Sequence, residues 1–294
     1  MTALDETQHP VSAPAVRRRR GAGVALMLGS SASNQVGAAL GAMAFPAIGP
    51  VGVVAIRQFV AAFVLAAIAR PTFRGLRRSQ WLPILGLSVV FSVMNLSLYT
   101  AMNRIGLGLA VTLEFVGPLT VAIASSRRPA DIACAAAAGI GVVMLTSPGY
   151  ATDYVGVGLA LLAAAGWASY VLLNRTVGER LPGLQGTAVA SVVTAAAWTP
   201  IAVGWFVFHT PTATGVLLAI ACGVMSSVAP YVGDLLALRR VPPHVFGVFT
   251  SINPVWAALA GWLVLHQTLD AGEWFGVALI VGSSALVSGR ALRV

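Results

Sequence analysis

The chain has 294 residues, of which 57% are hydrophobic and only 9% are charged, and its mean hydropathy is +0.85. Ordinary soluble domains carry about 25% charged residues, so this composition excludes a soluble globular protein and predicts an all-α membrane protein. The basic residues are all arginines and give a net charge of +9. Because they lie between apolar runs, they indicate orientation in a membrane, with lipid as a partner and no nucleic acid.

The sequence carries no recognisable catalytic or metal-binding motif. Its two cysteines, Cys134 and Cys222, lie inside apolar runs and form no disulfide framework. Metal-ligand spacings, nucleotide-binding loops and nucleophile motifs are absent from the sequence. We therefore expect no metal, no cofactor and no enzyme activity, and any transport would not draw on ATP bound by this chain.

Residues 1–20 are polar and end in four arginines, Arg17–Arg20, which predicts a disordered cytoplasmic tail. The next 36 residues, 21–56, carry no charge. A secretory signal peptide has a core of about 7–15 apolar residues, so this longer stretch indicates a retained first membrane span.

Helices of about 20 apolar residues cross a bilayer, and the chain contains ten such segments in succession. The break between the seventh and the eighth falls at Pro211 and its threonine-rich neighbours. The ten predicted spans are residues 22–42, 50–69, 81–101, 106–126, 130–147, 154–173, 184–207, 214–237, 244–265 and 271–289.

Arginine positions give an independent check on this count. If the N-terminus is cytoplasmic, sixteen of the eighteen arginines lie in the two tails or in the loops after spans 2, 4, 6 and 8. Arg104 lies on the other side of the membrane, and Arg57 lies within span 2. The positive-inside rule predicts such an excess, so we expect ten helices with both termini in the cytoplasm.

The two halves of the chain resemble each other at a shift near 136 residues. Glu114–Pro118 then falls on Thr250–Pro254, so the prolines inside spans 4 and 9 coincide. Since five is an odd number of spans, the second half enters the membrane from the opposite side. We therefore predict two inverted repeats, residues 21–148 and 149–294, an arrangement that recurs in secondary transporters with the substrate site between the repeats. A duplicated scaffold without transport is the alternative.

Two motifs carry a family resemblance: LEFVGPL at 113–119, followed by RRPAD at 127–131, and APYVGDLLALRR at 229–240, followed by Phe246-Gly247. With the ten-span layout, they resemble the drug/metabolite transporter superfamily, whose half-unit is the EamA domain, and within it the threonine/homoserine exporter branch. The resemblance implies a bacterial inner-membrane exporter of amino acids or similar small metabolites, driven by proton exchange. Three positions depart from the family, which usually or often has glutamate where this chain has Asp234, Asn253 and Gln267.

Three charged residues inside the spans are the first candidates for a substrate or proton site. At ~1.5 Å per helical residue, Glu114 lies ~12 Å and Arg57 ~10 Å from the outer ends of their spans. Unlike charges inside a membrane tend to pair, so these two either form a pair or share the charged ends of a zwitterionic substrate. A structural ion pair or a surface position is the alternative for Arg57, and snorkelling or a helix contact for Glu114. Asp234, near the cytoplasmic end of span 8, is either a ligand or a local salt-bridge or gate residue.

Polar and aromatic residues at mid-depth complete the candidate cavity, although each is also of a type that forms hydrogen bonds between membrane helices. They are Asn34, Gln35, Asn95, Tyr99, Trp167, Tyr170, Ser227, Tyr231 and Asn253. Pro118 and Pro254 each remove a backbone hydrogen bond and predict a helix kink, either beside the cavity or as a packing bend. The GxxxG pattern of Gly37 and Gly41 indicates close helix packing.

These features predict a secondary transporter that works by alternating access, with a small molecule as its substrate and Glu114 as the proton-linked group. A carrier for drugs, nucleobases or other metabolites is the alternative within the same fold. A membrane enzyme or a channel is the alternative outside it, although no catalytic set of ionisable residues converges in the sequence.

Overall fold

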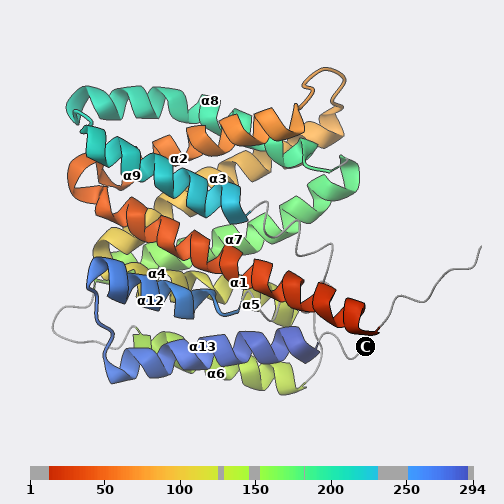
Figure 1. Cartoon of the computed structure of the whole chain (residues 1–294), viewed down its shortest axis with the longest axis vertical. Coiled ribbons are helices and arrows are strands. Elements are labelled where there is room, and N and C mark those ends of the chain that lie inside the picture. The colour runs from red at the N-terminus through yellow and green to blue at the C-terminus, as the bar shows by residue number, and fades with distance from the viewer. Residues whose placement is uncertain (1–12, 125–128, 146–152, 182, 231–250, 291–294) are drawn as a thin grey trace, which may run out of the picture.

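The computed structural model describes residues 13–124, 129–145, 153–181, 183–230 and 251–290, and every regular element in these ranges is a helix (Figure 1). The elements are α1 (Ala13–Met43), α2 (Phe45–Ala69), α3 (Arg78–Ile105), α4 (Leu107–Glu114), α5 (Val116–Ala124), α6 (Pro129–Leu145), α7 (Tyr154–Arg180), α8 (Gln185–Phe208), α9 (Ala213–Gly223), the π-helix η1 (Val224–Val228), α12 (Asn253–Leu265) and α13 (Ala271–Arg290). If α4–α5 and α9–η1 are each taken as one interrupted span, the described ranges hold ten helical segments in the predicted order.

The outer surface of these helices is apolar. Four of them, α2, α3, α7 and α8, are long and apolar enough to cross a membrane by length and composition. Phe63, Leu82 and Phe208 lie on three of these four helices and are 77%, 75% and 84% exposed. A soluble protein buries most large apolar side chains, whereas a surface that faces lipid exposes them. The fold is therefore that of a multi-pass helical membrane protein.

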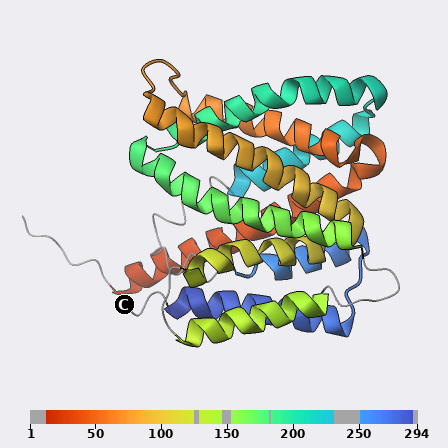
Figure 2. The same ribbon diagram turned by 180° about the vertical axis from the view of Figure 1, so that it is seen from behind.

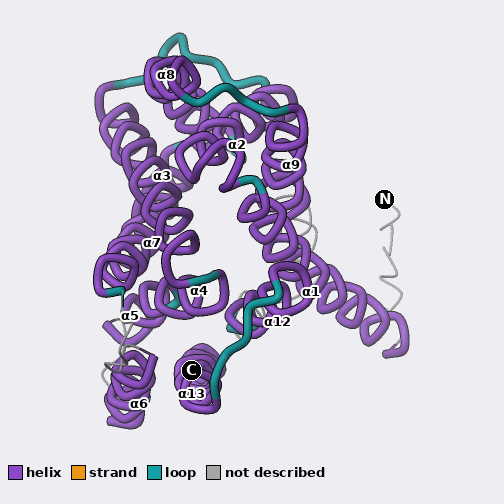
Figure 3. The backbone as a smooth tube through the Cα atoms, turned by 90° about the vertical axis from the view of Figure 1, so that its left-hand side faces the viewer, coloured by secondary structure: helices purple, strands orange, loops and turns teal. Residues whose placement is uncertain are grey.

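The helices lie side by side in one stack, with α8 packed on α2 at one edge and α13 on α6 at the opposite edge (Figure 1). Seen end-on, α3, α7, α5 and α6 form one row, and α9, α1, α12 and α13 form the other (Figure 3). From behind, α3 and α7 lie across the middle of the molecule and pack against each other (Figure 2). The two rows place α3 and α7 opposite α1 and α9.

The first helix begins earlier than the sequence predicted. α1 starts at Ala13 and includes Arg17–Arg20, which we expected in a disordered tail. Alanine and arginine are strong helix formers, and the proline at position 14 lies in the first turn, where a missing N–H costs no hydrogen bond. The helix therefore continues outward beyond the apolar span, while residues 1–12 lie outside the described ranges.

Span 4 is not one continuous helix. α4 ends at Glu114 and α5 begins at Val116. Because Pro118 has no N–H, the carbonyl of Glu114 lacks the donor that an unbroken helix would provide. In the second half, α12 begins at Asn253 with Pro254 in its first turn, where proline is well accommodated. The first part of predicted span 9, residues 244–250, lies outside the described ranges.

Hydrogen bonds connect helix ends and a loop at one end of the molecule. The Gln80 side chain donates to the carbonyl of Arg180 at 3.1 Å, and Gln185 donates to the hydroxyl of Thr72 at 2.6 Å. These contacts place the α2–α3 loop beside the α7–α8 turn. The two segments follow predicted spans 2 and 6, which we expected to end on the same side of the membrane. This arginine-rich end carries Arg70, Arg74, Arg77, Arg78 and Arg180.

The opposite end is held by different contacts. Arg104 forms a 2.8 Å ion pair with Asp153, and the backbone N–H of Leu107 donates to Gln267 at 2.9 Å. Asp153 also accepts from the N–H of Gly156 and so caps α7. This backbone hydrogen bond, together with Arg104, holds the pKa of the Asp153 carboxyl below its ordinary value. The Gln267 side chain therefore provides an acceptor for the first N–H of α4.

Candidate substrate cavity

A cavity of about 580 Å³ lies between α1, α2, α3, α7, α8, η1 and the start of α12. Its volume is within the range of about 300–1,000 Å³ that is usual for small-molecule sites. Its wall mixes one cation with hydroxyl, amide and aromatic groups. The polar and aromatic residues on the wall are Ser30, Ser31, Asn34, Arg57, Gln58, Phe91, Asn95, Trp167, Tyr170, Asn174, Thr187, Ser191, Ser226, Ser227 and Asn253.

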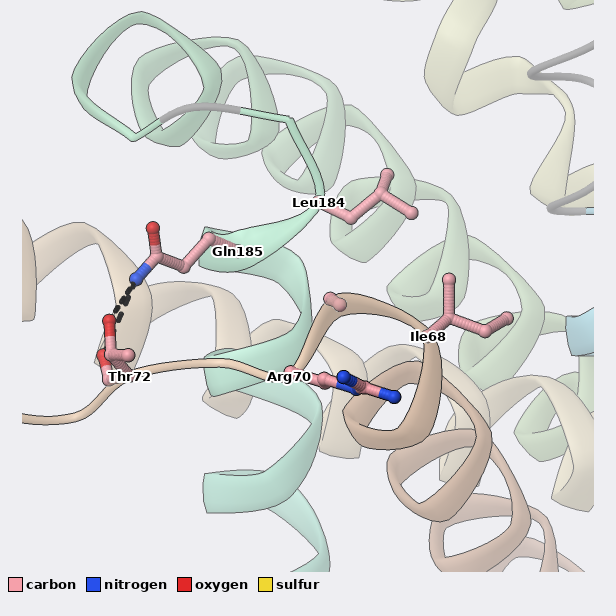
Figure 4. Close-up of a pocket in the computed structure, with 6 residues that line it drawn as sticks. Ile68, Arg70, Thr72, Leu184 and Gln185 are labelled. Atoms are coloured by element: carbon pink, nitrogen blue, oxygen red, sulfur yellow. Dashed lines mark hydrogen bonds between the residues drawn. The ribbon is translucent and has the colours of Figure 1, made fainter.

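The cavity extends toward the arginine-rich end of the molecule. Ile68 and Leu184 lie on its wall and also on the wall of a second pocket of about 400 Å³, which contains Arg70, Thr72 and Gln185 (Figure 4). The Gln185–Thr72 hydrogen bond borders this second pocket (Figure 4). Ile68 and Leu184 therefore lie between the cavity and the second pocket.

Arg57, on α2, is held by neutral groups. Its guanidinium donates to the side-chain oxygen of Asn95, to the hydroxyl of Ser227 at 3.4 Å and to the carbonyl of Ser226 at 3.4 Å. The guanidinium carbon also lies 5.2 Å from the centre of the Tyr99 ring, a cation–π contact. These three hydrogen bonds use three of the five N–H groups of the guanidinium. No described carboxylate forms an ion pair with Arg57, so its positive charge is available to an anion.

The π-helix η1 provides two of the groups that accept hydrogen bonds from Arg57, the Ser226 carbonyl and the Ser227 hydroxyl. A π-turn widens the helix and leaves backbone carbonyls without their usual donors, which is why such turns often occur at functional sites. Here the Met225 carbonyl accepts from Ser33 at 3.0 Å, and the Ser226 hydroxyl donates to the Asn34 carbonyl at 2.8 Å. η1 is therefore bound to α1 on one side and to Arg57 on the other.

The helices are closely packed around Tyr99, which lies next to Arg57. Tyr99 is buried, its hydroxyl lies 3.1 Å from the Cys222 sulfur, and its ring packs edge-on against Phe45. A Cβ added at Gly41 would lie 2.9 Å from that sulfur, and one added at Gly37 would lie 2.8 Å from the backbone of Ser226. The predicted close packing at these two glycines is confirmed, and α1 meets α9 and η1 there without a gap.

The structure brings most of the predicted site residues together, but not all of them. Those on the cavity wall are Asn34, Arg57, Asn95, Trp167, Tyr170, Ser227 and Asn253. Gln35, Tyr99 and Glu114 are buried but do not line the cavity. Tyr231 and Asp234 lie outside the described residues.

Glu114 differs most from its expected place. It is the last residue of α4, which packs against α12, α7 and α3, and it is 5% exposed. The described residues contain no ion pair between Glu114 and Arg57, whose guanidinium donates to Asn95 and Ser226 instead. Next to Glu114 in the chain, Phe115 packs edge-on against Trp167 of the cavity wall, with ring centres 5.3 Å apart.

Sequence reasoning missed several wall residues. Gln58 lies on the wall and donates to the Phe91 carbonyl at 3.3 Å. The sequence could have indicated this residue, because it is polar and directly follows Arg57 inside an apolar span. Asn174 and Thr187 form a 3.3 Å hydrogen bond closer to the arginine-rich end. A search limited to mid-depth residues could not find this pair. Within the described ranges no group of three His, Cys, Asp or Glu side chains could hold a metal.

The apolar helices therefore enclose a cavity whose wall carries one arginine and several hydroxyl and amide groups. Residues 154–289 match the EamA-like transporter family. Threonine/homoserine exporter RhtA of Escherichia coli K12 is 33% identical over 267 residues, covering 89% of each chain, and RhtA of Salmonella typhimurium LT2 has the same identity and coverage. The protein belongs to the EamA-like transporter family, and the predicted resemblance to the threonine/homoserine exporter branch is confirmed.

One solved structure supports the fold over nearly the whole chain. A protein whose crystal structure is known shares 20% sequence identity and superposes with a TM-score of 0.61. The superposition covers 94% of this chain and 99% of the other. At this identity the likeness extends to the fold alone.

Proposed function

We propose that the protein is a secondary transporter that exports small amino acids across the inner membrane of a bacterium by alternating access, coupled to protons. The observation that carries this proposal is the polar cavity built around Arg57, a cation with free N–H groups and no carboxylate partner among the described residues. The name of the Escherichia coli relative, an exporter of threonine and homoserine, supports amino acids as the substrate class.

The packing of the helices supports two inverted repeats. If α1, α2, α3, α4–α5 and α6 correspond to α7, α8, α9, α12 and α13, the largest contacts between the halves should have counterparts. The α3–α7 contact corresponds to α9–α1, and α4–α7 corresponds to α12–α1. The pairs α2–α8, α4–α12 and α6–α13 correspond to themselves, as expected on an approximate twofold axis. The cavity lies between repeats 21–148 and 149–294, where inverted-repeat transporters bind their substrates.

The arginine-rich end is the cytoplasmic end in this proposal, by the positive-inside rule, with both termini on that side. The cavity reaches Ile68 and Leu184 at this end, and the layer of Tyr99, Phe45 and Cys222 closes the other. The structure then represents an inward-facing state. Export requires that the inner end closes and that this outer layer separates.

Arg57 is the residue that we assign to the substrate carboxylate. Arginine presents N–H groups in a planar fork that matches a carboxylate, and a cation in a site of low polarity attracts an anion strongly. Asn95 fixes the direction of the fork, since its own amide donates to the Phe91 carbonyl at 2.7 Å. The free amino acid would thus bind with its carboxylate at the closed, outer part of the cavity.

Glu114 is the proton-linked group in this proposal. Replacing it by glutamine removes the titratable proton and keeps the size and hydrogen-bonding capacity of the side chain. We expect the Glu114→Gln variant to exchange amino acid across the membrane of proteoliposomes. Its transport rate should no longer rise when a pH gradient is imposed, whereas the wild-type rate should. Glu179→Gln, at an exposed carboxylate on α7, is the control and should keep the acceleration. A Glu114→Gln protein that still responds to the gradient would exclude Glu114 as the proton site.

Cys222 can report the opening of the outer layer. Its side chain is 0% exposed and lies against Tyr99. In a Cys134→Ala background, we expect a membrane-impermeant maleimide outside the cell to label Cys222 slowly, and faster when the cells are loaded with exported amino acid. Labelling at the same rate with and without the amino acid would contradict alternating access through this layer.

Counterflow tests the function as a whole. Purified protein is reconstituted into proteoliposomes that contain unlabelled threonine or homoserine, and labelled homoserine is added outside. We expect internal amino acid to accelerate the entry of label, because a carrier with bound substrate changes between its inward- and outward-facing states faster than an empty carrier. A channel would admit label without internal amino acid. If no amino acid accelerates entry, the proposed function is wrong.

A further inference from the structure

One buried polar atom of the cavity wall has no hydrogen-bond partner among the described residues. Asn253, the first residue of α12, lines the cavity and is 7% exposed. Its side-chain oxygen has no hydrogen-bond donor among the described residues. Buried amide oxygens without a donor are rare in folded proteins, because the lost hydrogen bond to water is not replaced. An unpartnered acceptor on the wall of a binding cavity therefore indicates where a ligand can donate a hydrogen bond.

Two other amide oxygens on the wall, those of Asn95 and Asn174, already have hydrogen-bond donors. The side-chain oxygen of Asn95 accepts from Arg57, and that of Asn174 accepts from the Thr187 hydroxyl at 3.3 Å. A substrate would have to break an existing hydrogen bond to use either oxygen. Asn253 offers its oxygen without this cost.

The position of Asn253 at the start of α12 favours a neutral donor. The first N–H groups of a helix have no partner within it, and the aligned peptide dipoles place partial positive charge at that end. No side chain caps α12 at Ile252. An ammonium group would be repelled by this partial charge, whereas a hydroxyl group donates a hydrogen bond without carrying charge.

We infer that Asn253 recognises the side-chain hydroxyl of a hydroxylated amino acid while Arg57 holds its carboxylate. This inference rests on the proposed function and adds a specificity-determining residue to it. Both residues lie on the wall of the same cavity, Arg57 from α2 and Asn253 from α12, and the volume of about 580 Å³ accommodates a small amino acid. Threonine and homoserine, the amino acids in the name of the Escherichia coli relative, each carry one hydroxyl group.

The first test uses the wild-type protein alone. Removing the hydroxyl from either threonine or homoserine gives the same molecule, 2-aminobutyrate, so one probe serves for both. A site that hydrogen-bonds a substrate hydroxyl rejects the analogue without it, because its own polar group is then left unpaired. In counterflow we expect kcat/KM for homoserine to exceed that for 2-aminobutyrate by at least about tenfold. Equal values for the two would overturn the inference and leave amino-acid transport intact.

The second test compares two asparagine variants. Asn253→Leu removes the unpartnered oxygen with little change in side-chain size, and we expect the preference for homoserine over 2-aminobutyrate to fall to within about twofold. Asn174→Leu is the matched control, since it removes a wall amide whose oxygen is already bonded. It should change transport of both substrates to the same extent. Asn253→Ser, which keeps a smaller acceptor, should retain part of the preference.

Each remaining result also has a definite meaning. If Asn253→Leu transports both substrates with the wild-type preference, Asn253 does not recognise the hydroxyl. If the variant instead loses its preference for homoserine over 4-hydroxybutyrate, which lacks the ammonium group, Asn253 binds the ammonium and the inference is wrong. Should Asn253→Leu not fold, the wild-type ratio and the Asn253→Ser ratio decide. A wild-type protein that transports no amino acid refutes the proposed function, and the inference with it.

Discussion

Replacing Arg57 by glutamine is expected to lower kcat/KM for amino-acid counterflow by at least about 25-fold. Truncating one partner of a buried, hydrogen-bonded charge pair costs about 2–5 kcal/mol, and each 1.4 kcal/mol is a factor of about ten. The substrate carboxylate would enter the cavity and lose its hydration without gaining a cation. Glutamine keeps one donor for the side chain of Asn95, so the loss should fall on transport more than on folding.

Two further variants make this result specific. Arg57→Lys keeps the charge but loses the planar fork and the geometry that Asn95 and Ser226 hold, so we expect an intermediate loss. Arg175→Gln removes an arginine whose side chain is 81% exposed and pairs with Glu179 on the surface. Such pairs contribute about 0–1 kcal/mol to stability, and transport should be unaffected. Wild-type counterflow by Arg57→Gln would remove Arg57 from the substrate site.

Replacing Gly117 by alanine is expected to destabilise the protein by about 3 kcal/mol, the upper part of the usual range for overpacking. A Cβ at this position would overlap the backbone carbonyl of Ala164 on α7. A backbone carbonyl cannot move aside as the end of a flexible side chain can, so α5 and α7 would have to separate. Trp167 lies one helical turn beyond Ala164 on the cavity wall, and its position should change as well. Thermal unfolding in detergent measures the loss.

Gly139→Ala is the matched control for this substitution. Gly139 also lies inside a helix, α6, but an added Cβ would have no neighbour within 4 Å. Alanine there should be neutral or should stabilise the helix by up to about 1 kcal/mol, because glycine is the poorer helix former. Equal melting temperatures for the Gly117 and Gly139 variants would contradict the close approach of α5 to α7.

Gly117 also explains part of the LEFVGPL motif. In that motif Glu114 ends α4, Phe115 lies at the break, Gly117 allows α7 to approach and Pro118 leaves a carbonyl free. The sequence indicated only a charged residue and a proline inside one apolar span. The need for glycine became visible only with the α7 backbone beside it.

The charged candidates show the limit of reasoning from depth. Glu114 and Arg57 lie at similar estimated depths, which suggested an ion pair. In the structure Arg57 contacts α3 and η1, and Glu114 lies on α4 without an ion-pair partner among the described residues. Depth along a membrane helix follows from residue counting, whereas the direction in which a side chain points depends on helix rotation. In this chain most faces of a span are apolar, so hydrophobic periodicity does not reveal the rotation.

The sequence by itself determined the number and order of the helical segments and the gathering of alternate loops at opposite ends. These features follow from local free energies, since each apolar stretch must enter lipid and each arginine favours one side of the membrane. Only the tertiary structure decided which polar residues share the cavity, that Glu114 does not lie on its wall, and that the side-chain oxygen of Asn253 has no donor among the described residues. Those features depend on helix breaks at Phe115 and η1 and on backbone contacts between distant segments, which no local pattern in the chain encodes.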